Sequence, residues 1–280
     1  MKVLVRRGIT ALIFVTVMLG GIYASPYSFV LLFALVTGLC LWEFFNIVLL
    51  HNARRDLIRR WLGIALGLIP YLLATIMQLN LLQEREAFVA LFALLFFPLI
   101  FSAFIYELYT RSEQPFVNLA FIALGVVYIG VPFGLLEFIA FEQGQFHPNL
   151  VFGLLAMTWM NDTGAYLLGS RFGKTPLFPR ISPKKTWEGT AGGGVMTLLL
   201  ALVLYQALGS LALIDWLILA AIVSVFGPLG DLVESMLKRS NQIKDSGALL
   251  PGHGGLLDRF DAFIFLLPFA AAYISWIRMG

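Results

Sequence analysis

Charged residues are scarce in this chain: Asp, Glu, Lys and Arg make up 12% of its 280 residues, whereas hydrophobic residues make up 60%. Soluble globular domains are about 25% charged, so the composition excludes a soluble protein and predicts an integral membrane protein. The formal net charge is only +3. We therefore expect no nucleic-acid partner, and basic residues beside the membrane suit anionic lipid headgroups better.

Cysteine and histidine are also rare, with one cysteine, Cys40, and three histidines. A single cysteine cannot form a disulfide within the chain, so cysteine usage does not indicate a redox compartment. The sequence offers no Ser–His–Asp or Cys–His arrangement for nucleophilic catalysis. It also shows no internal repeat of the kind found in inverted-repeat transporters.

Long apolar runs dominate what is present. A helix needs about 20 apolar residues to cross roughly 30 Å of hydrocarbon. Candidate runs lie at residues 9–24, 27–50, 61–82, 86–108, 116–141, 150–169, 190–209, 211–237 and 257–277. We therefore expect an all-α polytopic membrane protein with about nine transmembrane helices. The first run is expected to stay uncleaved, because cleavage after Ala24 would put Ile22 where a small residue is required.

The basic residues predict the orientation of the chain. All but two of the 19 Lys and Arg residues fall at the N-terminus or in even-numbered loops, and the exceptions are Arg85 and Arg278. Short loops rich in Lys and Arg stay in the cytoplasm. The N-terminus and the large charged loops are therefore expected to be cytoplasmic.

The two parts of the chain differ in where their polar residues fall. Residues 1–145 are hydrophobic spans joined by short loops, with few ionisable groups inside the spans beyond Glu43, Glu107 and Glu137. We interpret this part as transmembrane scaffold. From 146 to 280 polar residues occur within the spans as well as between them, so we expect a catalytic transmembrane region with cytoplasmic loops.

Acidic and basic residues concentrate around the last two spans. Asp231, Glu234 or Ser235, and Lys238 are one helical turn apart and share a face. Pro228 lies just before them between two glycines, which predicts a kink or a break in the helix. A simple ion pair within the helix is the alternative interpretation of this face.

A second pair of acids, Asp258 and Asp261, begins the last span, and their spacing points both carboxylates the same way. Together with Asp231 they would repel one another unless a cation lay among them. Oxygen ligands favour Mg²⁺ or Mn²⁺ over Zn²⁺. We therefore predict a divalent-metal site at these three carboxylates.

Two further polar groups precede this region. Asn161 and Asp162 lie in mid-span, where an ionised side chain costs about 2.5–3.5 kcal/mol. Asp162 therefore needs a cation or a hydrogen-bond donor. The alternative interpretation is hydrogen bonding between helices.

Lys184 and Lys185 precede a helix start, where free backbone N–H groups favour phosphate. A charge pair that only fixes topology is the alternative for the lysines. The role of Glu188 stays open, and Gly192–Gly194 favour close helix packing.

The chain contains two sequence boxes that resemble a known family. Between Ser235 and Asp261 the pattern is Ser-x-x-Lys-Arg, then Lys-Asp-x-Gly, then His-Gly-Gly-x-x-Asp-Arg-x-Asp. This pattern resembles the signature of phosphatidate cytidylyltransferases, and Ser-Pro-Lys-Lys-Thr-Trp-Glu-Gly at 182–189 is similar to a second box of that family. The resemblance implies CTP and phosphatidic acid as substrates, and CDP-diacylglycerol and pyrophosphate as products.

The same resemblance implies roles for individual residues. Asp231, Asp258 and Asp261 would hold the metal and, with Lys238, form the catalytic set. The expected substrate-binding residues are Asn161, Asp162, Lys184, Lys185, Thr186, Arg239, Lys244, Asp245, His253, Gly254, Gly255 and Arg259. We expect the bacterial inner membrane as the location, with the active site facing the cytoplasm. Members of the family are typically dimeric, so a homodimer is possible for this chain.

Two other functions were weighed. A CTP-dependent polyprenol kinase would use related residues but would transfer the γ-phosphate to an alcohol, and the full pattern ending in Asp-Arg-x-Asp is not expected of it. A cation-coupled transporter could use a broken helix with carboxylates near the membrane midplane. The charges between Lys238 and Arg259 instead form a cluster on the cytoplasmic side, which favours the transferase.

Overall fold

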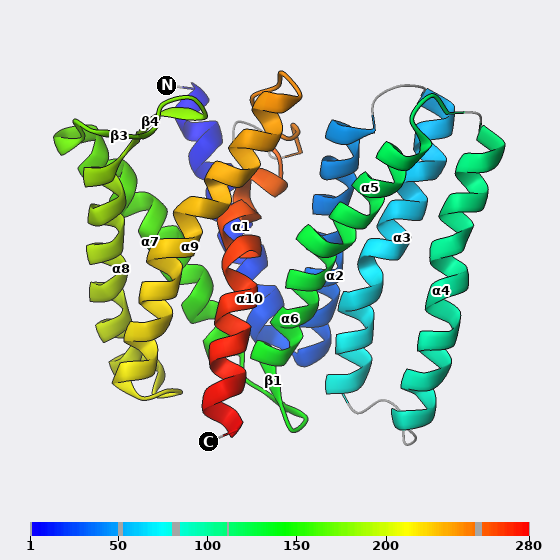
Figure 1. Cartoon of the computed structure of the whole chain (residues 1–280). Helices are drawn as coiled ribbons and strands as arrows, with labels where there is room; N and C mark the ends of the chain where they lie inside the picture. The colour runs from blue at the N-terminus through cyan, green and yellow to red at the C-terminus, as the bar shows by residue number, and fades with distance from the viewer. Residues whose placement is uncertain (1, 50–52, 80–84, 111, 250–253, 280) are drawn as a thin grey trace.

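Figure 1 shows the computed structural model, which describes residues 2–49, 53–79, 85–110, 112–249 and 254–279. The described residues are mostly helical, which confirms the all-α expectation. The helices are α1 Lys2–Ala24, α2 Pro26–Val48, α3 Ala53–Gln78, α4 Arg85–Thr110, α5 Pro115–Gly125, the π-helical turn η1 Val126–Gly130, α6 Val131–Ala140, α7 Pro148–Phe172, α8 Trp187–Leu208, α9 Leu213–Ser240 and α10 Leu257–Met279.

Strands are confined to two short antiparallel hairpins within the described ranges. Strand β1 Phe141–Glu142 pairs with β2 Gln145–Phe146, and β3 Pro176–Phe178 pairs with β4 Ser182–Thr186. The second hairpin joins α7 to α8 and carries the two adjacent lysines predicted to bind phosphate.

Six helical stretches of the described chain are long and apolar enough to cross a membrane. They are Pro26–Val48, Leu57–Gln78, Pro115–Ala140, Trp187–Leu208, Leu213–Ser240 and Leu257–Met279. Gly8–Ala24 is a shorter apolar helix. Each of the predicted apolar runs overlaps a helix, and the run at 116–141 corresponds to α5, η1 and α6 in direct succession. The chain is therefore an all-α membrane protein.

Local sequence explains several helix ends. Ser25 caps α2 because its hydroxyl accepts from Ser28 N while the Ser28 hydroxyl accepts from Ser25 N, and Pro26 follows in the first helical position. Gly209 ends α8 with a φ of +58°, a conformation that side chains disfavour. Capping of this kind satisfies backbone groups that have no partner within the helix.

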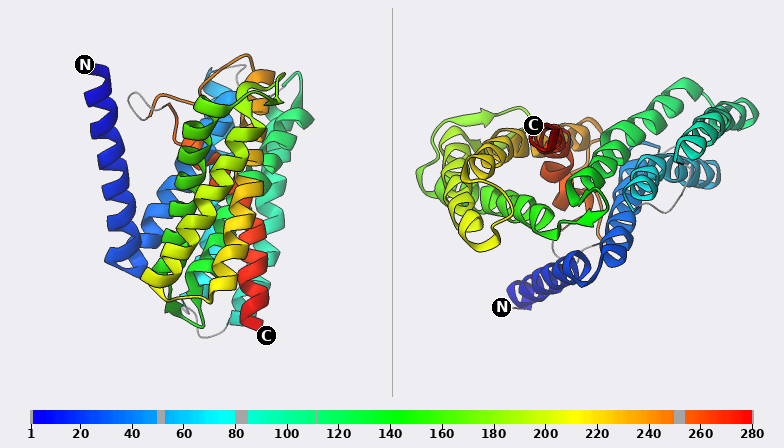
Figure 2. Two further views of the ribbon diagram at one scale, coloured as in Figure 1. Left: turned by 90° about the vertical axis from the view of Figure 1, so that its left-hand side faces the viewer. Right: turned by 90° about the horizontal axis from the view of Figure 1, so that it is seen from below.

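The helices run roughly parallel, with their connections gathered at two ends (Figure 1). In the C-terminal part α8 packs against α7 and α9, and α9 packs against α10. In the N-terminal part α3 packs against α2 and α6, and α6 in turn contacts α10. The N-terminus, the β3–β4 hairpin and the α9–α10 loop lie at one end, and the C-terminus lies at the other (Figures 1 and 2).

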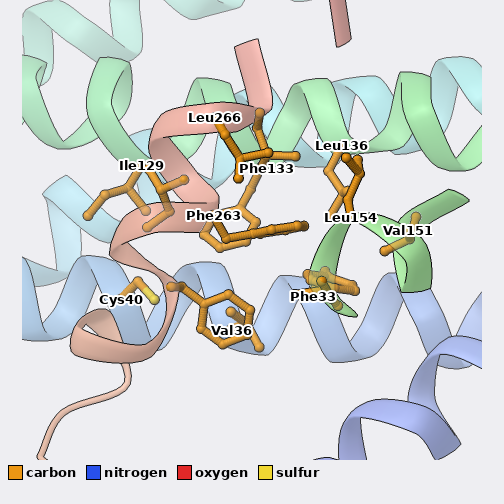
Figure 3. Close-up of a cluster of buried hydrophobic side chains, with 14 of the residues drawn as sticks. Phe33, Val36, Cys40, Ile129, Phe133, Leu136, Val151, Leu154, Phe263 and Leu266 are labelled. Carbon is orange, nitrogen blue, oxygen red and sulfur yellow. The ribbon is translucent and has the colours of Figure 1, made fainter. Parts of the chain in front are cut away.

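A buried apolar core joins the two parts of the chain. Figure 3 shows Phe33 and Cys40 of α2 close to Phe133 of α6 and Phe263 of α10, and all four are fully buried. Backbones also approach closely in this region, since a Cβ on Gly130 would collide with the Gly67 carbonyl. Close packing of this kind is a main source of helix association in membranes. It fixes α10, and with it the acids at its start, against the scaffold.

The structure narrows the prediction of a kink or a break at Pro228. Helix α9 continues through this proline from Leu213 to Ser240, so the helix is not broken, and a kink stays a prediction. A proline removes one hydrogen bond from a helix, and membrane helices tolerate such a loss when neighbouring groups and packing compensate.

Candidate active site

Lys238 stands between two carboxylates on neighbouring helices. Its Nζ lies 2.6 Å from Glu234 Oε2, one turn earlier in α9, and 2.6 Å from Asp258 Oδ1 in α10. The Glu234 side chain is fully buried, and its other oxygen, Oε1, has no hydrogen-bond partner. The predicted acid–base face on α9 is thus present, and it connects α9 to α10.

Asp258 also organises the loop that precedes α10. Its Oδ2 accepts hydrogen bonds from Ser246 N at 3.1 Å and from Gly255 N at 2.8 Å. Gly254, with a φ of +82°, is so close that a Cβ would lie 2.7 Å from Asp258 Oδ2. The carboxylate of Asp258 is therefore already bound by Lys238 and two backbone amides.

Asp231 links the two sequence boxes, because it contacts Lys185 of the 182–189 box and Ser235 of the other box. Lys185 Nζ lies 2.5 Å from Asp231 Oδ2, and both side chains are partly exposed. Asp231 Oδ1 also accepts a hydrogen bond from Ser235 Oγ at 3.2 Å. Lys184 is exposed beside them, and no ion pair of its side chain occurs among the described residues. One lysine of the pair points to the acids, and the other is free to meet a ligand.

Asp261 is the buried acid of the group, and the hydrogen bond described for its side chain comes from the adjacent Ala262 N at 2.7 Å. Asp162, Asp231 and Glu234 lie near enough to repel its charge. Close approach of α9 makes this possible, because Gly230 packs directly against the backbone of Asp261. Buried acids in mutual repulsion are neutralised either by a proton or by a cation.

The predicted divalent-metal site is not assembled in this arrangement. In the parts of the chain that the structure describes, no three His, Cys, Asp or Glu side chains are grouped closely enough to hold one metal ion. Asp258 is bound by Lys238 and two amides, and Asp231 is bound by Lys185 and Ser235. Glu234 Oε1 is buried without a hydrogen-bond partner. A metal site at Asp231, Asp258 and Asp261 therefore stays a prediction.

Asn161 and Asp162 are adjacent but face different surroundings. Asn161 is buried between α7 and α8, where its Nδ2 donates to Thr197 Oγ1 at 3.2 Å. Asp162 is exposed and lies within electrostatic range of Lys185, Asp231 and Arg259. The structure thus places Asp162 with the acids and bases of the site, and Asn161 in a helix interface.

Thr186 and Glu188 shape the start of α8. Thr186 Oγ1 caps the helix by accepting from Gly189 N at 3.1 Å. The Glu188 carboxylate accepts from Lys174 N at 3.1 Å and from Thr175 N, which fixes the preceding loop. Gly193 lies against the α7 backbone, where a Cβ would meet Asn161 O at 2.6 Å, so the expected close helix packing is confirmed.

The remaining predicted residues lie around the α9–α10 loop. Arg239 Nη1 donates to Ile243 O at 3.1 Å and so shapes its own turn, while Lys244 and Asp245 are exposed. Arg259 is exposed on the first turn of α10. His253 lies outside the described residues. The described segments that carry these residues, the end of α9 with the loop after it and the start of α10, follow one another in the chain and lie towards the same end of the bundle (Figure 1).

Glu43 was missed by sequence reasoning, which placed it in the scaffold. Its Oε2 accepts from Ser246 Oγ at 3.0 Å and from Leu257 N at 2.8 Å, so a residue of α2 reaches the loop that carries the site. A lone carboxylate inside an apolar span indicates that the side chain has a specific hydrogen-bonding partner. Local spacing in the sequence does not identify that partner, because it lies in a distant segment.

Known proteins provide an independent comparison. The chain is 44% identical over 167 residues to the "Phosphatidate cytidylyltransferase" of Bacillus subtilis (strain 168), a match that covers 59% of this chain and 61% of that protein. It is 36% identical over 271 residues, 96% of both chains, to the protein of the same name from Staphylococcus saprophyticus. A third relative of that name, from Staphylococcus haemolyticus, is 42% identical over 58% of this chain and 62% of its own.

A family model gives the broadest match. It is described as "Cytidylyltransferase family" and covers residues 5–277, which includes both sequence boxes and the cluster of acids and lysines. The chain therefore belongs to the cytidylyltransferase family.

Proposed function

We propose that the chain is a phosphatidate cytidylyltransferase that transfers CMP from CTP to phosphatidic acid, giving CDP-diacylglycerol and pyrophosphate. The observation that carries the proposal is the pair of contacts that Asp231 makes with Lys185 and with Ser235, because they join the 182–189 box to the first residue of the Ser235–Asp261 box. Family membership and the printed names of the relatives support the same activity.

The reaction suits a site without a strong base. The phosphate monoester of phosphatidate has a second pKa near 6 and is mostly dianionic at pH 7, so it needs no base to become a nucleophile. One of its oxygens attacks the α-phosphorus of CTP, the bond from the α-phosphorus to the β-bridging oxygen breaks, and pyrophosphate leaves with the bonding electrons. The protein then has to align the reactants and offset their negative charge.

We assign these tasks to the residues around the cluster. Lys184 and Lys185 would bind substrate phosphate, supported by their place before the N-terminus of α8, where the helix dipole favours an anion. Lys238 would hold Asp258 and the loop in place. The other proposed phosphate and nucleotide contacts are Asp162, Thr186, Arg239, Lys244, Asp245, His253, Gly254, Gly255 and Arg259. Asn161, which was expected to bind substrate, would act only through the α7–α8 interface in which it is buried.

Asp231 and Asp261 would hold Mg²⁺ or Mn²⁺, with Asp258 as the predicted third ligand. When bound, the ion would offset the charge of the triphosphate. Without it, Asp261 keeps its burial among other acids. That unfavourable arrangement is what supports the assignment.

We further propose nine membrane spans, an inner-membrane location and a cytoplasmic active site. The distribution of Lys and Arg supports this orientation, and the apolar helix Gly8–Ala24 supports an additional span at the start. Residues 1–145 would act as scaffold and 146–280 as the catalytic region, with membrane lipids around both. A homodimer is proposed on the family resemblance alone.

Isotope labelling tests the function against its closest rival. With purified protein, phosphatidate and CTP labelled at the α-phosphate, labelled lipid and free pyrophosphate are expected. A lipid kinase would instead transfer label from the γ-phosphate of CTP to a polyprenol and leave α-label in soluble CDP. That second pattern would reject the transferase.

A further inference from the structure

We propose that Glu43 of α2 is a positioning residue that holds the α9–α10 loop in the conformation in which Asp258 faces Lys238. The expected effect of Glu43 on turnover rests on the proposed function. Its structural basis is independent of that function, because it consists of contacts between α2 and the loop.

Glu43 contacts both ends of the described loop. Its Oε2 accepts from the Ser246 hydroxyl and from Leu257 N, the first backbone amide of α10. These partners lie 203 and 214 residues away in the chain. A carboxylate at the start of a helix is favoured by the helix dipole and by the free N–H groups there. Glu43 therefore joins the loop and the start of α10 to α2.

Glycines let the carboxylate come this close. A Cβ on Gly247 would lie 2.5 Å from Glu43 Oε1, and a Cβ on Gly255 would collide with Glu43 Oε2 and Ser246 Oγ. Position 255 therefore accommodates glycine but no side chain, because a Cβ there would collide with the Glu43 carboxylate. Because side chains at these two positions would displace the carboxylate, the loop and Glu43 fit together as one unit.

Glu43 reaches Asp258 through Ser246. Ser246 N donates to Asp258 Oδ2 while the Ser246 hydroxyl donates to Glu43, so the two carboxylates hold one residue from opposite sides. Glu43 is 5% exposed and is enclosed by core residues of α2. A side chain so buried does not meet substrate directly, and its influence has to pass through the loop.

Substitutions at Glu43 test the proposal. Glu43→Ala leaves the Ser246 hydroxyl and Leu257 N without partners and is expected to lower kcat about 10- to 100-fold, since small misplacements near a reacting centre have effects of this size. Glu43→Gln keeps an oxygen that can accept from both groups and is expected to stay within about threefold of the unaltered protein. Glu137→Gln is the matched control, because Glu137 is a fully buried carboxylate of α6 outside the site. Equal kcat in Glu43→Ala and the unaltered protein would overturn the proposal.

Hydrogen–deuterium exchange in detergent supplies a readout that does not need turnover. The amides of Ser246 and Leu257 are expected to exchange at least tenfold faster in Glu43→Ala than in Glu43→Gln or the Glu137 control. Unchanged exchange would contradict the positioning role even if turnover fell. Absence of turnover in the unaltered protein would reject the proposed function, and exchange would still decide the role of Glu43.

A milder variant covers the case in which Glu43→Ala does not fold. Ser246→Ala removes only the hydroxyl between Glu43 and the loop, and a several-fold lower kcat is expected with the protein intact. Where Glu43→Ala folds, combining it with Ser246→Ala should give less than the product of the two separate effects, because both act on one contact. Fully multiplicative effects would show that Glu43 does not act through Ser246.

Discussion

Lys185 and Asp231 form an ion pair with Nζ and Oδ2 2.5 Å apart, which links the loop before α8 to the middle of α9. Sequence reasoning assigned these residues to different ligands, the lysine to phosphate and the aspartate to a metal. In the structure each neutralises the other. A phosphate or a cation that enters the site therefore has to compete with, or share, this existing pair.

The two adjacent lysines are expected to differ in their effect. Lys185→Gln should raise the KM for CTP or phosphatidate about 10-fold or more, because a charge-assisted hydrogen bond contributes about 1.5–3 kcal/mol. Lys184→Gln should raise it about three- to tenfold, since Lys184 is proposed to bind phosphate but is exposed, where solvent and salt screen its charge. Steady-state kinetics with each substrate varied in turn would measure both. If the variant that carries both Lys184→Gln and Lys185→Gln inserts normally into the membrane and its kinetics are unchanged, the two lysines only help to set the membrane topology.

Asp261→Asn is expected to leave the protein folded in detergent and to remove most turnover. Asparagine keeps the size of the side chain but lacks the charge that would attract a divalent cation. Turnover should be followed across a Mg²⁺ titration, with size-exclusion chromatography as the check on folding. Near-normal turnover at saturating Mg²⁺ would reject Asp261 as a ligand, and the same test applies to Asp231→Asn.

Lys238→Met is expected to destabilise the fold. The change leaves Glu234 and Asp258 facing each other without a cation in a site where the lysine is 11% exposed, and removing one partner of a buried ion pair costs about 3–5 kcal/mol. Thermal unfolding in detergent would measure the loss. Adding Glu234→Gln to Lys238→Met should recover part of it, because one of the unpaired charges is then gone.

Cysteine labelling in intact cells would test the orientation. With Cys40 replaced by Ala, a cysteine at Lys244 should be shielded from an impermeant reagent, and one at Met279 should be labelled. Met279 is 86% exposed, whereas Arg278 is unsuitable because its guanidinium binds Ile139 O at 3.1 Å and Glu142 at 3.0 Å. Labelling of both positions from one side would mean that the number of spans is wrong by one.

Much of the architecture could be predicted because it depends on local properties. Apolar length determines where helices form, and the predicted runs all overlap helices of the described chain. The face of Asp231 and Lys238 also followed from helical periodicity. For Pro228 local propensity left a kink and a break both open, whereas α9, which packs against α8 and α10, is continuous through the proline.

Contacts between distant segments could not be predicted in the same way. Glu43 meets Leu257 only because α2 and α10 are neighbours in the bundle, and one sequence carries no information on which helices are neighbours. For the same reason Asn161 was grouped with Asp162, although its amide faces Thr197 on α8. Glu188 was left open, and its partners are backbone amides, which have no sequence signature.

The π-helical turn at Val126–Gly130 lies between α5 and α6, and it determines how this continuous segment would respond to a change in its number of residues. Such a turn contains one residue more than a regular helix needs. The wide turn absorbs this extra residue, so deleting one residue there would leave a regular helix in which α5 and α6 keep about the same relative orientation. Adding a further residue would instead rotate α5 by about 100° relative to α6. Gly125 could then no longer lie against Phe45 while Gly134 stayed against Pro70. The π-helical turn therefore makes this segment more tolerant of a deletion than of an insertion.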